Sequence, residues 1–367
     1  MEERAVRQLS EQLPFVLYRK PGQLNVKGIF QTDDRLHLDA PLTDSGFLMA
    51  PFDHLEPSVF IMADSIMEGD YPALKGNGPI KRSAVNLDLE NDHKDIHTEL
   101  IRTALKEIGR GRFKKVVLSR KMDVPLSEPP LRIFANLLGS YASAFCYLWY
   151  HPKVGLWCGA SPELLMSLVN QRFTTMSLAG TKSYVEGMQA QWGQKEKEEQ
   201  SMVTDYIVEV LQERLVDLHV SATSTIRAGN LWHLRTGISG RLVSGDLPGL
   251  LRSLHPTPAV GGIPAEAAKD FILARENYHR GFYTGYLGEI NIREHSERGR
   301  SKRNVENRAY GSGSGKTALY VNLRCMQLLG DTARIFVGGG ITAESQAESE
   351  WMETVAKSET MLQVLQK

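Results

Sequence analysis

The chain alternates between runs of short apolar segments and a few long helical segments, and this alternation constrains the fold more than any other feature. Segments with the composition of strands lie at residues 115–119, 145–150, 154–158, 172–178, 319–323 and 334–337. Longer segments at 93–109, 201–218 and 348–365 have the apolar spacing of helices. Strands that follow one another through short turns pair antiparallel, whereas parallel strands need a long crossover between them. The sequence therefore predicts an α+β fold with antiparallel sheets.

The pattern changes near residue 90. Residues 1–90 are irregular, with strand-like fragments at 47–50 and 59–63 among loops rich in Pro and Gly. We interpret them as a variable N-terminal part of the same fold, and residues 91–367 as its main, more regular region. Within that region, residues 292–315 are dense in Arg, Ser, Asn and Gly and have no apolar face, which predicts a flexible insertion.

Composition excludes several classes of protein. The chain has 367 residues with 42% hydrophobic, and Lys plus Arg equals Asp plus Glu at 43 each, so no net charge favours nucleic acid or an anionic membrane. The N-terminal residues lack the apolar core of a signal peptide, and no segment has the length of a membrane span. Cys146, Cys158 and Cys325 have no C-x-x-C spacing and predict buried thiols in a reducing compartment. We expect a cytoplasmic protein.

The segment GSGSGKT at 311–317 resembles a phosphate-binding loop. The full pattern requires a further glycine where this chain has Tyr310, and a helix where a strand-like segment begins. A nucleotide site is therefore the weaker alternative, and a flexible linker is the favoured interpretation.

Two helical segments each begin with a pair of glutamates on the face that continues into the apolar stripe. Glu196 and Glu199 form the first pair, and Glu350 and Glu353 form the second. The second pair follows three glycines at 338–340, which let the backbone approach a ligand closely. Buried carboxylates need a cation, and Mg²⁺ prefers oxygen ligands. The alternative for each pair is a solvated acidic first turn, which the helix dipole favours.

Several short motifs resemble, in the same order, those of the chorismate-utilising enzymes, which comprise isochorismate, salicylate, anthranilate and aminodeoxychorismate synthases. The motifs are KVVLSR at 115–120, GASPELL at 159–165, SLAGTK at 177–182, LWHL at 231–234, HPTPAVGG at 255–262, RGFYTG at 280–285 and GGGI at 338–341. The resemblance runs from about residue 90 to the end of the chain, and it implies that residues 91–367 are the chorismate-binding catalytic region. It implies antiparallel sheets packed face to face with helices outside, and a cleft that holds chorismate and Mg²⁺.

The resemblance also assigns roles to the matching positions. It implies Lys115 as the base that activates water and Glu163 as the acid that protonates the departing hydroxyl. Both acidic pairs match the metal site, with Glu199 and Glu353 as direct ligands and the other two glutamates, Glu196 and Glu350, close by through water. The substrate-binding positions implied are Gly180, Thr181, His233, Ala259, Val260, Tyr283, Arg324, Gly338, Gly339 and Lys357.

Some of these roles have a simple chemical reason. Arg324, Tyr283 and Lys357 are expected to bind the carboxylate of the enolpyruvyl arm, since an arginine offers paired charge-assisted hydrogen bonds. His233 is expected to contact substrate or orient the acid, and a structural core histidine is the alternative. Without the resemblance, Arg324 would be interpreted as the exposed end of a strand and Lys115 as an ordinary exposed lysine.

Among these relatives, the residues favour an isochorismate synthase. Lys115 favours addition of water over ammonia, because anthranilate synthases lack a lysine there, and Ala179 stands where aminodeoxychorismate synthases carry a nucleophilic lysine. Ala259-Val260 replaces the Thr-Ala of salicylate synthases, which are the closest alternative; a non-catalytic chorismate-binding homologue is a second one. Gln200 replaces a histidine common in relatives.

We expect no glutaminase subunit, and we favour menaquinone biosynthesis over siderophore biosynthesis because no siderophore-specific feature is present.

Overall fold

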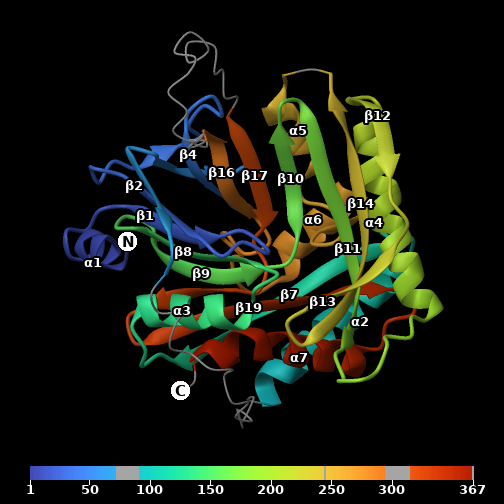
Figure 1. Ribbon diagram of the computed structural model, residues 1–367. Helices are drawn as coiled ribbons and strands as arrows, with labels where there is room; N and C mark the ends of the chain where they lie inside the picture. The colour runs from blue at the N-terminus through green and yellow to red at the C-terminus, as the bar shows by residue number, and fades with distance from the viewer. Residues whose placement is uncertain (72–90, 244, 294–314, 366–367) are drawn as a thin grey trace.

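Two antiparallel β-sheets pack face to face, and helices cover their outer surfaces (Figure 1). The computed structural model describes residues 1–71, 91–243, 245–293 and 315–365, so most of the predicted insertion at 292–315, including residues 311–314 of the glycine-rich segment, lies outside the described residues. This architecture confirms the predicted α+β fold. Within the described residues, no helix is both long enough and apolar enough to span a membrane.

The first sheet has the strand order β15-β7-β19-β18-β9-β8-β1-β2-β6. Its strands are β1 (Phe15–Arg19), β2 (Val26–Phe30), β6 (Ser65–Gly69), β7 (Lys115–Pro125), β8 (Phe145–His151), β9 (Gly155–Ser161), β15 (Gly262–Ile263), β18 (Cys325–Leu329) and β19 (Thr332–Thr342). The long antiparallel ladder between β7 and β19 places Lys115 opposite Thr342 and Val117 opposite Gly340. This register brings the predicted base next to the glycines at 338–340.

The second sheet has the order β12-β14-β11-β10-β17-β16-β4-β5-β3, and β13 pairs with β14. Its strands are β3 (His37–Leu38), β4 (Gly46–Ala50), β5 (Val59–Met62), β10 (Leu164–Val169), β11 (Arg172–Ser183), β12 (Leu215–Val220), β13 (Ser224–Ala228), β14 (Leu231–Leu242), β16 (Tyr286–Ile292) and β17 (Lys316–Val321). The N-terminal segment contributes strands to both sheets.

The helices are α1 (Glu2–Ser10), α2 (Asn91–Gly109), α3 (Pro130–Ser140), α4 (Gln194–Gln212), α5 (Leu247–Leu254), α6 (Ala265–Arg275) and α7 (Ala347–Leu365). The predicted helices at 93–109 and 348–365 are confirmed as α2 and α7. The helix predicted at 201–218 is wrong at its C-terminal end, because α4 ends at Gln212 and the following residues form the strand β12. The β-branched residues of β12 pair with β14 instead of extending the helix.

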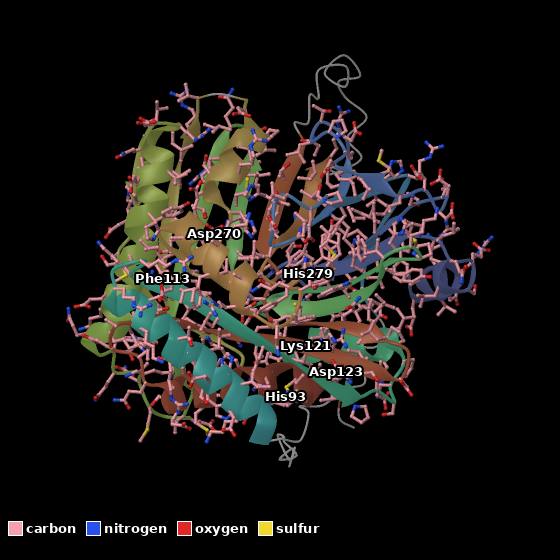
Figure 2. All side chains as sticks on the ribbon, turned by 180° about the vertical axis from the view of Figure 1, so that it is seen from behind. His93, Phe113, Lys121, Asp123, Asp270 and His279 are labelled. Atoms are coloured by element: carbon pink, nitrogen blue, oxygen red, sulfur yellow. The ribbon has the colours of Figure 1, made fainter. Side chains whose placement is uncertain are left out.

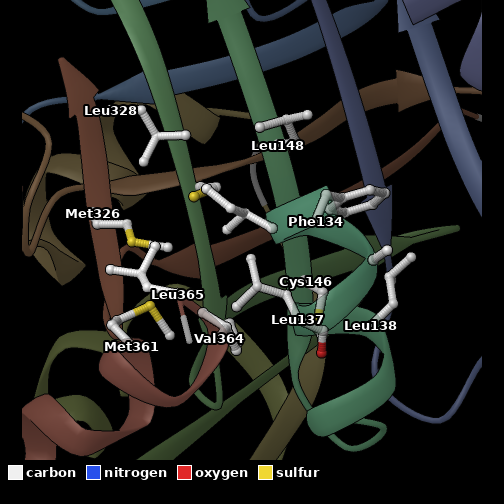
Figure 3. Packing of buried hydrophobic residues seen from close by; sticks show 14 of the residues in the cluster. Phe134, Leu137, Leu138, Cys146, Leu148, Met326, Leu328, Met361, Val364 and Leu365 are labelled. Atoms are coloured by element: carbon white, nitrogen blue, oxygen red, sulfur yellow. The ribbon is translucent and has the colours of Figure 1, made fainter. Parts of the chain in front are cut away.

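Alternation along the strands builds a core on each face of the first sheet. In β1, Val16 and Tyr18 face the second sheet, whereas Phe15 and Leu17 face the layer of helices. Figure 3 shows this outer layer, in which residues of α3 and α7 pack on β8 and β18. The three cysteines are buried and unpaired with one another, as predicted.

Helices α2 and α6 pack against β7 on the side shown in Figure 2, where His93 lies on α2, Asp270 on α6 and Lys121 on β7. The strand is therefore held between these helices and the interior of the molecule. This packing fixes the position of Lys115 at the start of β7.

Candidate active site

One cavity between the two sheets collects most of the predicted site residues. Its walls come from β7 and β19 of the first sheet, from β11 and β14 of the second, and from the N-terminal halves of α4 and α7. The predicted residues that line it are Glu163, Gly180, Thr181, Glu199, His233, Ala259, Val260, Tyr283, Arg324, Gly338, Gly339, Glu353 and Lys357. Lys115, Glu196 and Glu350 do not line it.

Lys115 lies at the edge of the cavity, on the same face of β7 as the lining residue Val117. Its side chain is completely buried, and its Nζ donates a hydrogen bond of 2.8 Å to Oε1 of Glu199. A methyl group on Gly340 would lie 3.5 Å from this Nζ, so the missing side chain at Gly340 leaves room for the amine beside the cavity. The exposed strand-start lysine that the residues alone would suggest is therefore wrong.

Glu163 lies on the opposite wall and is 2% exposed. Among the described residues, no protein group donates a hydrogen bond to its carboxyl group. Burial raises the pKa of Glu163 to about 8, against the opposing charge of Lys115. The carboxyl group therefore holds its proton at neutral pH and can act as an acid.

This raised pKa predicts how stability depends on pH. Below the unfolded-state pKa of roughly 4.3, Glu163 is protonated in both states. Between that value and about 8, only the unfolded chain releases the proton, so the native protein loses stability as the pH rises. We expect Glu163→Gln to remove this dependence, so that the unfolding free energy of the variant relative to wild type grows by about 3 kcal/mol between pH 5 and pH 8. Urea denaturation of both proteins across this range measures it, and a constant difference contradicts it.

Arg324 is a buried cation without an anionic partner among the described residues. It is 9% exposed and donates to Oγ1 of Thr360 at 3.1 Å and to Nε2 of His233 at 3.2 Å. Desolvation lowers the pKa of its guanidinium. The residue lies between β17 and β18 with φ +48°, so the expectation of a strand at this position is wrong. A buried arginine that lines a cavity and lacks a carboxylate is suited to bind an anionic ligand.

His233 holds Arg324 in place. Because a guanidinium can only donate, Nε2 of His233 must accept, and its Nδ1 therefore carries the proton and donates to the Gly180 carbonyl at 2.9 Å. Burial, together with the charge of Arg324, lowers the pKa of His233 to about 3, which keeps the ring neutral. No hydrogen bond joins it to Glu163 among the described residues, so it orients the arginine and not the acid.

Two further predicted ligands flank Arg324. Nζ of Lys357 donates to the Gly338 carbonyl at 2.9 Å and forms an ion pair with Glu353 at 2.6 Å. Tyr283 stacks on Phe336 with 5.4 Å between ring centroids, and its hydroxyl lies 2.9 Å from the position of a methyl group on Gly338. An ammonium, a guanidinium and a phenol thus face one end of the cavity.

The acidic pairs define an acidic end of the cavity, which begins at Glu353, the ion-pair partner of Lys357. Glu199, Glu350 and Glu353 are each paired with a lysine. Glu199 pairs with Lys115, and Glu350 pairs with Lys195 at 2.6 Å. Burial works to raise the pKa of Glu199, but the charge and hydrogen bond of Lys115 outweigh it and the pKa lies below its usual value. Burial and the charge of Glu353 raise the pKa of Glu350. Among the described residues, no three acidic, His or Cys side chains are gathered closely enough to form a complete metal site.

Glu196 has a local structural role. Its Oε2 accepts a hydrogen bond of 2.7 Å from the backbone N–H of Gly193, which is one half of a capping box at the start of α4. The other half is missing because the N-cap is a glycine without a side chain, so the usual sequence signature of the motif is incomplete here.

The prediction missed several lining residues, of which Gly340 is the most informative. A methyl group there would lie 2.7 Å from Oε1 of Glu199 and 3.0 Å from Cε of Lys115. The other missed residues line the walls: Val117, Pro162, Leu178, Thr284, Leu323, Phe336 and Val337. The period of two along β7 places Val117 on the same face as Lys115 and could have revealed it.

We expect Gly340→Ala to lower turnover about 10- to 100-fold, because the added methyl group must displace Glu199 or Lys115. Gly139→Ala, in α3 where nothing lies within 4 Å of the new methyl group, is the matched control and should keep full activity. Steady-state kinetics on the two variants measures the effect. Equal activity of the two variants would show that the lack of a side chain at Gly340 is not required by the site.

Comparison with known proteins agrees with this geometry. A family model described as chorismate binding enzyme matches residues 71–298, which is more than half of the chain, and a second model of the same description matches residues 309–363. The chain belongs to the chorismate-binding enzymes. Isochorismate synthase EntC of Escherichia coli (strain K12) is 33% identical to this chorismate-binding enzyme over 281 residues, which cover 72% of this chain and 66% of EntC.

Two solved structures share the fold of this chorismate-binding enzyme. DhbC from Bacillus anthracis superposes with a TM-score of 0.76 at 21% identity, covering all of this chain and 99% of that one. MenF, the menaquinone-specific isochorismate synthase from Escherichia coli, superposes with a TM-score of 0.74 at 19% identity, covering 96% of this chain and 89% of that one. The match to DhbC covers the whole of this chain and therefore includes the elements that form the cavity.

Proposed function

We propose that this enzyme is a magnesium-dependent isochorismate synthase, which interconverts chorismate and isochorismate. The observation that carries the proposal is the arrangement in one cavity of Arg324, a cation without an anionic partner among the described residues, and of the protonated acid Glu163, with the buried amine of Lys115 at the edge of the cavity. Family membership and the EntC relative support the same reaction.

Chorismate carries two carboxylates, and the cavity has two ends of different character. The end formed by Arg324, Lys357 and Tyr283 suits the carboxylate of the enolpyruvyl arm, because it offers two cations and a neutral donor. The ring and its carboxylate would then extend toward Glu163 and the acidic helices. Val260 and Ala259 border the ring between these two ends.

The acidic end has a donor set that suits Mg²⁺. Oε2 of Glu350 and Oε1 of Glu353 each lie 3.7 Å from the position of a methyl group on Gly339, and Glu199 lies next to Gly340. The raised pKa of Glu350, caused by burial and by Glu353, indicates negative charge that the lysines do not fully neutralise. Glu199, Glu350 and Glu353 would hold the ion after the lysine ion pairs open, and Glu196 would stay at its capping position.

When bound, Mg²⁺ supplies positive charge that holds the ring carboxylate of the substrate. The chain's own residues perform the proton transfers. Lys115 acts in its neutral form: after its ammonium has released a proton to solvent, the free amine removes a proton from the water that adds at C2 of the ring. Glu163 gives its proton to the hydroxyl that departs from C4 as water, while the ring double bonds shift. One water enters and one leaves, so the reaction is an isomerisation.

The pathway proposal is menaquinone biosynthesis, because the sequence carries no siderophore-specific feature. Salicylate synthase, which also eliminates pyruvate, is the alternative that the experiment must exclude. We propose that no glutaminase partner is required, because water and not ammonia is the incoming nucleophile.

The experiment is incubation of the purified protein with chorismate and Mg²⁺, with the products separated by chromatography and pyruvate assayed in parallel. We expect isochorismate without pyruvate, and no product after removal of the metal with a chelator. Salicylate with stoichiometric pyruvate would identify a lyase, and binding of chorismate without turnover would identify a non-catalytic homologue.

A further inference from the structure

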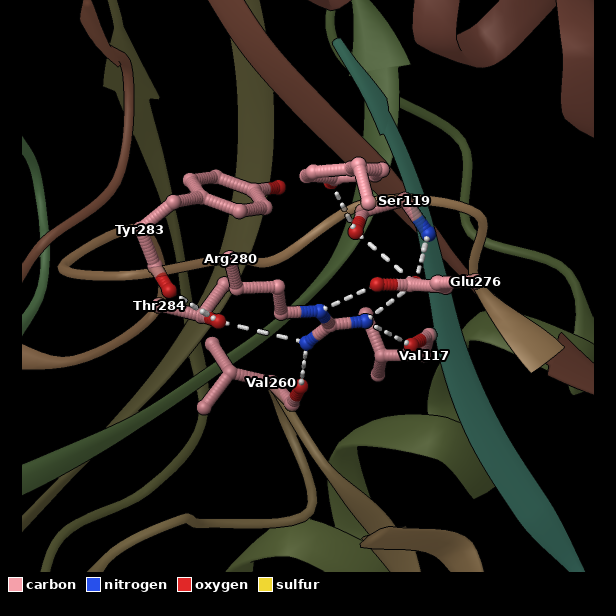
Figure 4. A network of polar contacts seen from close by, with 8 residues as sticks. Val117, Ser119, Val260, Glu276, Arg280, Tyr283 and Thr284 are labelled. Carbon is pink, nitrogen blue, oxygen red and sulfur yellow. Dashed lines mark hydrogen bonds and ion pairs between the residues drawn. The ribbon is translucent and has the colours of Figure 1, made fainter. Parts of the chain in front are cut away.

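A buried ion pair lies just outside the cavity and bonds to three of its walls (Figure 4). Glu276 follows the C-terminal end of α6, and Arg280 lies four residues further on. Their side chains are 1% and 2% exposed. Neither residue lines the cavity or has a role in the proposed proton transfers.

All five N–H donors of Arg280 are used. Nε and Nη2 bind the two carboxylate oxygens of Glu276 at 2.7 and 2.6 Å. The second hydrogen of Nη2 binds the Val117 carbonyl at 2.7 Å, and Nη1 binds the Val260 carbonyl and Oγ1 of Thr284, both at 3.2 Å. The guanidinium also stacks 4.5 Å from the Phe52 ring. A planar guanidinium whose five N–H donors are all bound can adopt only one orientation. It therefore fixes the positions of its partners relative to one another.

The three partners other than Glu276 all line the cavity, and they come from separate parts of the chain. Val117 belongs to β7, two residues after Lys115; Val260 lies in the loop beside the expected position of the ring; Thr284 adjoins Tyr283. Thr284 has φ +59°, a conformation that needs support from its surroundings. Arg280 therefore sets the spacing between the strand of the base, the ring wall and the turn that carries Tyr283.

Glu276 extends this connection along β7. Its Oε1 accepts hydrogen bonds from both the backbone N–H and the hydroxyl of Ser119, at 2.7 and 2.8 Å. The ion pair therefore holds β7 at two points, Val117 and Ser119, on the C-terminal side of Lys115. A buried ion pair is a weak source of net stability, so its value to the protein must lie in the geometry that it imposes.

We propose that Arg280, held by Glu276, is a positioning residue for the isomerisation: it keeps the base strand, the Val260 wall and the Thr284 turn at the spacing that the reaction requires. This inference rests on the proposed function. It concerns turnover more than substrate binding, because neither Arg324 nor Lys357, the cations expected to bind the substrate carboxylate, is hydrogen-bonded to Arg280 among the described residues.

The test compares Arg280→Lys with a matched arginine elsewhere. Lysine keeps the charge opposite Glu276 but cannot reach the three cavity walls at once. We expect kcat to fall about 10- to 100-fold, as for a displacement of about 1 Å in an active site, with KM changed less than about threefold. Arg334→Lys is the control, because Arg334 forms a two-bond ion pair with Asp123 (2.8 and 2.7 Å) that also joins β7 to β19, at the end of the ladder away from the cavity. Asp123 is labelled in Figure 2.

If Arg280→Lys does not fold, a second variant still tests the inference. Ser119→Ala removes one hydrogen bond to Glu276 and leaves the cavity lining intact; it should lower kcat by about threefold with unchanged KM. Rates are divided by the amount of folded protein, so a merely structural role would leave kcat at the wild-type value. Wild-type kcat in these variants overturns the inference while the proposed function stands. A wild-type protein that forms no isochorismate overturns the proposed function, and the inference with it.

Discussion

Lys115→Gln is expected to lower the turnover of chorismate by about 10²- to 10⁴-fold, the range that loss of a general base produces. Lys115 is fully buried at the edge of the cavity, its Nζ binds Oε1 of Glu199, and the missing side chain at Gly340 leaves room for its amine. Glutamine keeps a donor for Glu199 but has no basic nitrogen, so the water that adds to the ring keeps its proton. Initial rates of isochorismate formation measure the loss.

Two controls show whether the expected loss of turnover is specific to Lys115: the binding of chorismate to the variant, and the substitution of a second lysine on the same strand. The groups that bind the enolpyruvyl carboxylate are unchanged in Lys115→Gln, so the dissociation constant for chorismate, measured by calorimetry, should stay within about threefold of wild type. Lys121→Gln, on the same strand β7 but outside the cavity, should keep wild-type turnover. If Lys115→Gln retained more than about a tenth of the activity, Lys115 would not be the base.

The second large effect is expected at Arg324. Replacing it with methionine removes the buried cation that faces the substrate carboxylate, which costs about 3 kcal/mol of binding free energy, or roughly 10²-fold in affinity. Arg324→Lys should lie between the two proteins, because an ammonium restores the charge without the paired hydrogen bonds. Steady-state kinetics should show the loss mainly in KM.

His233 provides the control for this prediction. It contacts Arg324 through Nε2 and holds its own tautomer through the Gly180 carbonyl, so His233→Asn should weaken chorismate binding less than removal of Arg324 itself. A KM of Arg324→Met within threefold of wild type would show that this end of the cavity does not bind the carboxylate.

The period of the apolar residues was enough to predict the α+β class with antiparallel pairing, whereas the face-to-face layers were implied only by the resemblance to the chorismate-utilising enzymes. Helices α2 and α7 and the central strands follow from periods of 3.6 and 2. The segment after Gln212 was predicted wrongly because Leu215 and Leu218 also fit a helical face, and only pairing with β14 decides for a strand. Local patterns carry no information about such partners.

Local sequence patterns predict even less of the candidate site, because its geometry depends on contacts between distant residues. The ion pair between Lys115 and Glu199 joins residues 84 positions apart, and it depends on the register of β7 with β19. The left-handed conformation of Arg324 and the network around Arg280 likewise arise from tertiary contacts. Residue types alone favoured ordinary surface roles for Lys115 and Arg324, and only the ordered set of motifs indicated their place in the cavity.

The most direct test of the central claim is a single turnover of chorismate by the Mg²⁺-loaded enzyme in water enriched in ¹⁸O, with the product analysed by mass spectrometry. Addition of water at C2 predicts isochorismate with one ¹⁸O atom, in its C2 hydroxyl. Isochorismate that retains only the original oxygen would contradict the account, because the hydroxyl would then have moved within the substrate and Lys115 would have no water to activate.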